Sequence, residues 1–180
     1  MTGQLTRTRP DFHSGCIGLV TCSTAAVLPS LGLLRPHAYP VLTDILGYLM
    51  PLRAAARRTL MEGAFPIWDT YTQCGQSLAG NPIVGLFYPP FLLSLAIPGW
   101  WGAKLYILFH YWLLGMGAYL FCRHALRVRG MAAVVGGIML SANGYIQSMV
   151  FNFHFTSLPW LLLAGALWGE GEGSSRDGRA

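Results

Sequence analysis

Three carboxylates, Asp44, Glu62 and Asp69, stand between two long apolar stretches of this chain. A carboxylate can bind a divalent metal or take a proton from a hydroxyl group. Asp44 follows the first apolar stretch and is the leading candidate for either role. The structural alternative is also specific, because an aspartate is favoured at a helix N-terminus by capping and by the helix dipole. Asp69 could equally anchor a turn or contact a ligand.

Three arginines, Arg53, Arg57 and Arg58, follow Asp44 within a short segment. Guanidinium groups hold phosphate oxygens through paired hydrogen bonds, so these side chains could bind the phosphate or pyrophosphate of a lipid-linked substrate. The alternative is simple attraction to anionic lipid head groups.

Residues 63–90, GAFPIWDTYTQCGQSLAGNPIVGLFYPP, form an aromatic stretch interrupted by proline and glycine. Each proline removes a backbone donor and clashes with the preceding helical turn. The stretch therefore cannot be one regular helix, and we expect an ordered loop or a broken interfacial segment.

The composition sets the class of protein. Hydrophobic residues make up 53% of the 180 residues and charged residues only 11%, and the mean hydropathy is +0.45. Ordinary soluble domains carry roughly 25% charged residues. The sequence therefore predicts an integral membrane protein, all-α, that folds as a polytopic helix bundle.

We expect about four membrane spans, at residues 16–34, 100–122, 131–151 and 153–168. Each span needs about 20 residues. Residues 100–122 are the clearest, with Trp100 and Trp101 at one end, Lys104 able to extend outward, and Arg123 closing the other end. Residues 1–15 form a cytoplasmic N-terminus, residues 35–99 an external loop, and residues 169–180 a disordered cytoplasmic tail.

The arginines predict the orientation. If residues 82–98 lie at the interface, the basic residues before the first span, in the 123–129 segment and in the tail all fall on one side. The positive-inside rule makes that side cytoplasmic. We therefore expect a plasma-membrane protein with both termini in the cytoplasm.

The external loop should begin with an amphipathic helix that lies on the membrane. At 100° per residue, one narrow stripe collects the apolar residues Ile45, Leu49, Leu52, Ala56 and Leu60. Pro51 should kink this helix or divide it in two.

Other chemistries are poorly supported. The sequence contains no phosphate-binding glycine loop, no Cys-x-x-Cys and no Gly-x-Ser-x-Gly. A soluble nucleotide enzyme is therefore excluded, and we expect no nucleic-acid partner. The sequence does not set the oligomeric state. The four cysteines are expected to act as small hydrophobic residues, and His110 to make a hydrogen bond between helices.

The order of these features resembles the start of the bacterial YfhO-like membrane proteins, which belong to the GT-C superfamily of polytopic glycosyltransferases. The resemblance covers about residues 16–168. Its motifs are Pro66-Ile67-Trp68-Asp69, Gly75 with Asn81-Pro82, Tyr88-Pro89, Ser141-Ala142-Asn143-Gly144 and Leu158-Pro159-Trp160.

The resemblance implies transfer of a sugar, usually with inversion, from a polyprenyl-phosphate donor to an acceptor outside the cytoplasm. An acidic residue of the first external loop then serves as metal ligand, for Mg²⁺ or Mn²⁺, or as general base, and here it matches Asp44. The segment from Trp68 through Asp69 to Asn81 would line the donor or acceptor cleft. An arginine among Arg53, Arg57 and Arg58 would meet the donor phosphate.

Proteins of that family normally continue through many more spans. We therefore expect this chain to be a fragment or a truncated product, without turnover of its own. The alternative is a small non-enzymatic membrane protein, acting as a scaffold or as a component of a transporter, in which Asp44 can be replaced harmlessly.

Overall fold

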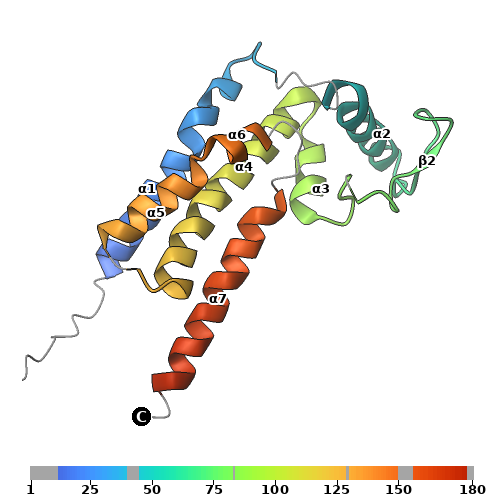
Figure 1. Ribbon diagram of the computed structural model, residues 1–180. Coiled ribbons are helices and arrows are strands. Elements are labelled where there is room, and N and C mark those ends of the chain that lie inside the picture. The colour runs from blue at the N-terminus through green and yellow to red at the C-terminus, as the bar shows by residue number, and fades with distance from the viewer. Residues whose placement is uncertain (1–11, 40–44, 83, 129, 150–155, 178–180) are drawn as a thin grey trace, which may run out of the picture.

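The computed structural model describes residues 12–39, 45–82, 84–128, 130–149 and 156–177. The described fold is mostly helical, with one small hairpin. Its centre is α4 (Gly99–Leu120), which contacts α1 (Phe12–Val27), α5 (Met131–Ser141) and α7 (Ser157–Asp177). Figure 1 shows these four helices side by side, so the predicted helix bundle is present in this part of the chain.

Two of the helical stretches are long and apolar enough to cross a membrane. Helix α1 continues through η1 (Leu28–Leu34), and α4 continues through η3 (Phe121–Ala125). The resulting stretches, Gly15–Leu34 and Gly99–Ala125, have mean hydropathies of 1.8 and 1.5. They match the first two predicted spans by length and composition.

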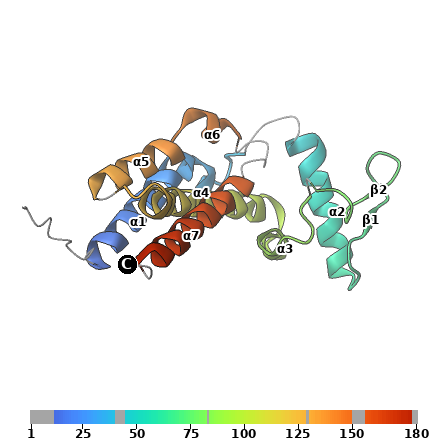
Figure 2. The same ribbon diagram turned by 60° about the horizontal axis from the view of Figure 1, so that its bottom comes forward.

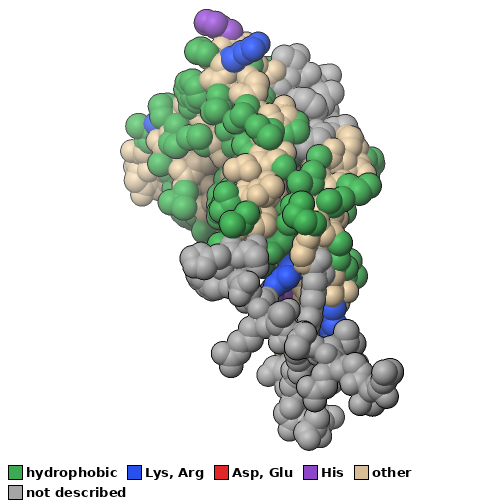
Figure 3. Space-filling model, turned by 90° about the vertical axis from the view of Figure 1, so that its left-hand side faces the viewer, with side chains coloured by type: hydrophobic (Ala, Val, Ile, Leu, Met, Phe, Trp, Pro, Cys, Tyr) green, Lys and Arg blue, Asp and Glu red, His purple; other side chains and the backbone are tan. Residues whose placement is uncertain are grey.

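The outer surface of the bundle is apolar. Figure 3 shows hydrophobic side chains over most of the described part of one face. On α1, Ile17 and Val20 are 67% and 58% exposed, and on α5 Met139 is 70% exposed. Such a surface is typical of helices that face lipid, because apolar patches of this extent are rare on soluble monomers.

Glycines allow the helices to approach closely. A Cβ atom on Gly115 of α4 would lie only 2.8 Å from the Cα of Ser23 on α1, and one on Gly117 would lie 3.0 Å from the Pro159 carbonyl oxygen of α7. Small residues at such crossings bring two backbones into contact, which is the main source of packing energy between helices in lipid.

A second group of elements lies beyond one end of the bundle. It contains η2 (Ile45–Leu49), α2 (Met50–Met61), β1 (Trp68–Asp69), β2 (Gln76–Ser77) and α3 (Pro89–Ala96). Strands β1 and β2 pair antiparallel, with Trp68 opposite Ser77. Figures 1 and 2 both show this group at the end opposite the beginning of α1 and the end of α7.

The predicted apolar stripe of residues 45–60 is confirmed. Ile45, Leu49, Leu52 and Ala56 are buried, and Leu60 packs against the same cluster. The stripe faces protein, since Leu78, Leu86 and Phe91 belong to this cluster. The helix changes from π to α geometry next to Pro51, where the missing backbone donor interrupts the regular hydrogen-bond ladder.

The segment predicted as a third span, residues 131–151, is broken in the structure. Helix α5 ends at Ser141, and α6 (Gly144–Met149) follows after a turn. The Ser141 hydroxyl donates to the Gly137 carbonyl, and the Asn143 side chain accepts from the Tyr145 amide at 2.8 Å. These bonds end one helix and begin the next. The 11 residues of α5 rise only about 16 Å, which is short of the roughly 30 Å hydrocarbon core.

The C-terminal region also differs from the expected disordered tail. Helix α7 extends to Asp177, and residues 178–180 lie outside the described part. Close packing explains the extension, because a Cβ atom on Gly169 would lie 2.6 Å from the Cα of Ala125. The Oε1 atom of Glu170 also lies 2.8 Å from the Nδ1 atom of His124. Contact with η3 thus stabilises the helical conformation of a segment whose own composition favours disorder.

Among the described residues of the 82–98 segment, no helix is long enough to cross a membrane. Helix α3 has eight residues, roughly 12 Å at 1.5 Å each. Pro89 and Pro90 occupy its first turn, where a missing amide donor costs little.

Candidate anion-binding site

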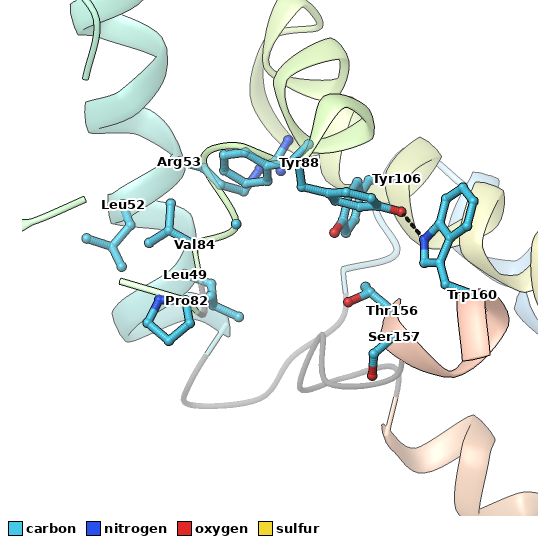
Figure 4. Close-up of a pocket in the computed structure, with 12 residues that line it drawn as sticks. Leu49, Leu52, Arg53, Pro82, Val84, Tyr88, Tyr106, Thr156, Ser157 and Trp160 are labelled. Carbon is cyan, nitrogen blue, oxygen red and sulfur yellow. Dashed lines mark hydrogen bonds between the residues drawn. The ribbon is translucent and has the colours of Figure 1, made fainter. Parts of the chain in front are cut away.

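A cavity of about 240 Å³ lies where the outer group meets the bundle. Helix α2, the segment before α3, α3 itself, α4 and the start of α7 all contribute to it. Figure 4 shows a polar side with Tyr88, Tyr106, Thr156, Ser157 and Trp160, and an apolar side with Leu49, Leu52, Pro82 and Val84. Arg53, Gly85 and Phe91 complete the lining.

Arg53 is the charged residue of this cavity. Its side chain is only 6% exposed. The Nη2 atom donates to the hydroxyl of Ser94 at 3.0 Å, and the guanidinium lies 5.1 Å from the centre of the Phe91 ring. The Nη1 atom is buried without a hydrogen-bond partner, and no carboxylate among the described residues pairs with Arg53.

Burial lowers the pKa of Arg53 to about 10, because the charged guanidinium loses water contact. Arg53 therefore stays charged at neutral pH. A buried cation without a counter-charge is strongly unfavourable, and an unsatisfied buried donor adds to that cost. An anion in the cavity would relieve both, so the site is suited to a phosphate-like group.

Tyr88 links three elements at the polar side of the cavity. Its hydroxyl lies 2.7 Å from the Nε2 atom of His110 on α4, and the Nε1 atom of Trp160 on α7 donates to it at 2.6 Å. The Nδ1 atom of His110 lies 2.7 Å from the carbonyl oxygen of Tyr106. His110 was expected to form a hydrogen bond to another helix, and its partner is instead Tyr88, which directly precedes α3.

Of the three predicted arginines, only Arg53 lines the cavity. Arg57 donates to the Leu95 carbonyl at 3.0 Å and so holds α2 against α3. Arg58 lies over the ring of Tyr71, 5.0 Å from its centre. All three arginines, with Glu62, also line a more open cleft of about 450 Å³ on the other side of α2.

The predicted residues of the hairpin region do not line the cavity. The Asp69 carboxylate is 2% exposed and accepts from the Tyr71 amide and the Thr72 hydroxyl, so it anchors the turn between the strands. Trp68 is 56% exposed and covers Gly75, whose φ of +103° favours glycine. Asn81 donates to the Tyr48 hydroxyl at 2.6 Å and thereby fixes the loop beside the cavity.

Asp44 lies outside the described residues, so its predicted catalytic or metal-binding role stays a prediction. Within the described part of the chain, no three His, Cys, Asp or Glu side chains come together as a metal site.

The aromatic and hydroxyl lining was not predicted as a site. Tyr88 and Trp160 both stand in sequence motifs next to a proline, but nothing in the sequence indicates that they meet. They are 72 residues apart and are joined only by the packing of α7 on α4.

The sequence matches no family model, no curated protein and no solved structure. The function must therefore be argued from the cavity and its chemistry.

Proposed function

We propose that this chain belongs to a GT-C type membrane glycosyltransferase, similar to the YfhO-like proteins, that uses a polyprenyl-phosphate sugar donor and an acceptor outside the cytoplasm. The observation that carries the proposal is the buried, unpaired Nη1 atom of Arg53 in a cavity at the end of an apolar helix bundle. The donor phosphate binds this guanidinium through charge-assisted hydrogen bonds.

An apolar groove beside Arg53 suits the polyprenyl chain. It has a volume of about 240 Å³ and is lined by Pro90, Leu93, Ser94, Ile97, Leu105, Tyr106 and Phe109. Two of these residues connect it to the phosphate site, since Ser94 accepts a hydrogen bond from Arg53 and Tyr106 lines the cavity as well. An isoprenoid in the groove would thus place its phosphate near Arg53.

The arrangement of the helices supports a multi-pass topology with both termini in the cytoplasm. The beginning of α1 and the end of α7 lie at one end of the bundle, and the cavity lies toward the other. In a bacterial plasma membrane this arrangement opens the cavity to the external side. The break between α5 and α6 then falls in the third membrane segment, and residues 142–145 at this break are exposed.

Asp44 precedes η2 and is proposed as the general base that activates the acceptor hydroxyl. Its place in the chain, one segment before Arg53, favours a position on the same side of the membrane.

The test compares two ligands that differ only in the phosphate. The full chain in detergent should bind polyprenyl phosphate at least tenfold more tightly than the matching polyprenol, because a charge-assisted hydrogen bond contributes about 1.5 to 3 kcal/mol. Arg53→Gln should abolish this difference. Arg35→Gln, which removes the same charge from an exposed position, should preserve it.

Equal affinity for both ligands would reject the phosphate site and would favour the scaffold or transporter alternative. A second test measures sugar transfer in membranes that contain the longer protein of which this chain is expected to be a fragment. Asp44→Asn should fold and bind polyprenyl phosphate, but transfer no sugar. Full transfer by Asp44→Asn would exclude the role of general base.

A further inference from the structure

The hydrogen bonds of His110 determine which of its ring nitrogens carries the hydrogen. Its Nδ1 atom lies 2.7 Å from the Tyr106 carbonyl oxygen, which can only accept. The Nδ1 atom therefore carries the hydrogen. Because a neutral imidazole has one such hydrogen, its Nε2 atom is an acceptor.

The hydrogen bonds of Tyr88 likewise determine whether its hydroxyl can donate or accept. Its hydroxyl lies 2.7 Å from the Nε2 atom of His110, so it donates its only hydrogen there. The indole of Trp160 can only donate, and it donates to the Tyr88 oxygen at 2.6 Å. Tyr88 is thus left with one acceptor position and no hydrogen to offer a ligand.

The cavity therefore combines two opposite polar groups. Arg53 can only donate, and its Nη1 atom has no partner. Tyr88 can only accept, and both residues line the cavity. A ligand that satisfies both must have an anionic oxygen at one place and a hydrogen-bond donor, such as a hydroxyl, at another.

We propose that Tyr88 is a specificity-determining residue that accepts a hydrogen bond from a ligand hydroxyl. His110 and Trp160 hold it in this acceptor state. The cavity then selects hydroxylated phosphate esters over esters of the same shape without hydroxyls. The inference rests on the proposed function only in that the phosphate binds Arg53.

The experiment uses glucose 1-phosphate and cyclohexyl phosphate, which share a six-membered ring and a phosphate but differ in their hydroxyls. Calorimetry with the full chain in detergent at pH 8 should show glucose 1-phosphate binding about tenfold more tightly, the size of one neutral hydrogen bond. Tyr88→Phe should bring the ratio of the two affinities close to one. Tyr39→Phe, at an exposed tyrosine, should keep the wild-type ratio.

The outcomes separate the two proposals. If neither ligand binds the wild-type chain, or if binding does not depend on Arg53, the phosphate site itself fails. If both bind equally through Arg53, the phosphate site stands and the role of Tyr88 is overturned.

Discussion

Burial gives Arg53 its chemical character. A guanidinium at the surface would donate all its hydrogen bonds to water or to neighbouring groups. In Arg53 the Nη1 atom is instead buried without a hydrogen-bond partner. Phe91 and Ser94 hold the group in place without neutralising it. The residue therefore keeps a full charge that a ligand can use.

The pKa of Arg53 predicts how anion binding depends on pH. Because the folded-state pKa is lowered to about 10 from 12.5, the folded chain loses this proton before the unfolded chain does. Below about pH 10 the guanidinium is charged in both states and its burial disfavours folding, and this penalty shrinks as the pH rises through 10. Binding of dibutyl phosphate, a monoanion throughout, should be constant from pH 7 to 9 and fall above about 10.

Calorimetry with circular dichroism as a check of folding measures this profile. Tyr88 should not interfere, because burial raises its pKa. Arg53→Lys should move the fall to lower pH, since lysine has the lower ordinary pKa. Binding that stays constant to pH 11 would show that Arg53 does not hold the anion.

At the scale of the elements, close contact between backbones holds α1 against α4. Cys22 and Ser23 of α1 lie directly over Gly115. The interface therefore tolerates no side chain at this glycine, and any substituent must separate the two helices.

Gly115→Ala should destabilise the bundle by about 1 to 3 kcal/mol, the usual cost of overpacking a tight interface. Thermal unfolding in detergent measures the effect. Gly15→Ala in the same bundle is the matched control, because a Cβ atom there meets nothing within 4 Å and alanine favours the helix. Equal unfolding temperatures for the two variants would contradict this packing.

Lys104 joins the end of η1 to the start of α4. The sequence led us to expect this side chain to extend outward, but it is 1% exposed. Its Nζ atom donates to the Arg35 carbonyl at 2.8 Å and lies over the rings of Tyr39 and Trp101. The charge is satisfied by carbonyl oxygens and aromatic faces, which explains why it can be buried.

Lys104→Met should therefore release residues 28–38 from α4 while keeping the apolar stem. Hydrogen exchange should become at least tenfold faster in that segment, since roughly 1.5 kcal/mol or more is lost with a charged hydrogen bond. Arg35→Gln, which leaves the accepting backbone carbonyl in place, should exchange at the wild-type rate. Unchanged protection in Lys104→Met would mean that the contact does not hold the segment.

At the scale of the whole molecule, a bundle with an apolar surface carries a group of shorter elements at one end. The cavity forms where the two parts meet, so neither part contains the site alone. Hairpin β1 to β2 is at the far end of this group, and its free cysteine, Cys74, is exposed.

Cys74 tests the proposed orientation. An impermeant thiol reagent should label it in intact cells, because the hairpin is proposed to lie outside the cytoplasm. Cys74→Ser should remove this signal, since Cys22 and Cys122 are buried and Cys16 lies in the first candidate span. Labelling that requires cell lysis would place the hairpin in the cytoplasm and reverse the topology.

The elements were more predictable than the site. The two long apolar stretches and the stripe of Ile45 to Leu60 follow from local periodicity, which depends on the sequence alone. The break after Ser141 and the extension of α7 were missed. Both depend on contacts that composition does not reveal. The break follows a hydrogen bond from the Ser141 side chain to the backbone of its own helix, and the extension of α7 depends on its packing against η3.

The sequence by itself determined that this chain is apolar and mostly helical, with arginines and a proline-rich stretch between its long helices. Only the tertiary structure decided which arginine is buried and that Tyr88, His110 and Trp160 meet beside it. The physical reason is that helical periodicity is local, whereas burial and hydrogen-bond partnership depend on the packing of distant segments. Arg53, which this packing leaves with a buried and unpaired nitrogen, is the residue on which the proposed function rests.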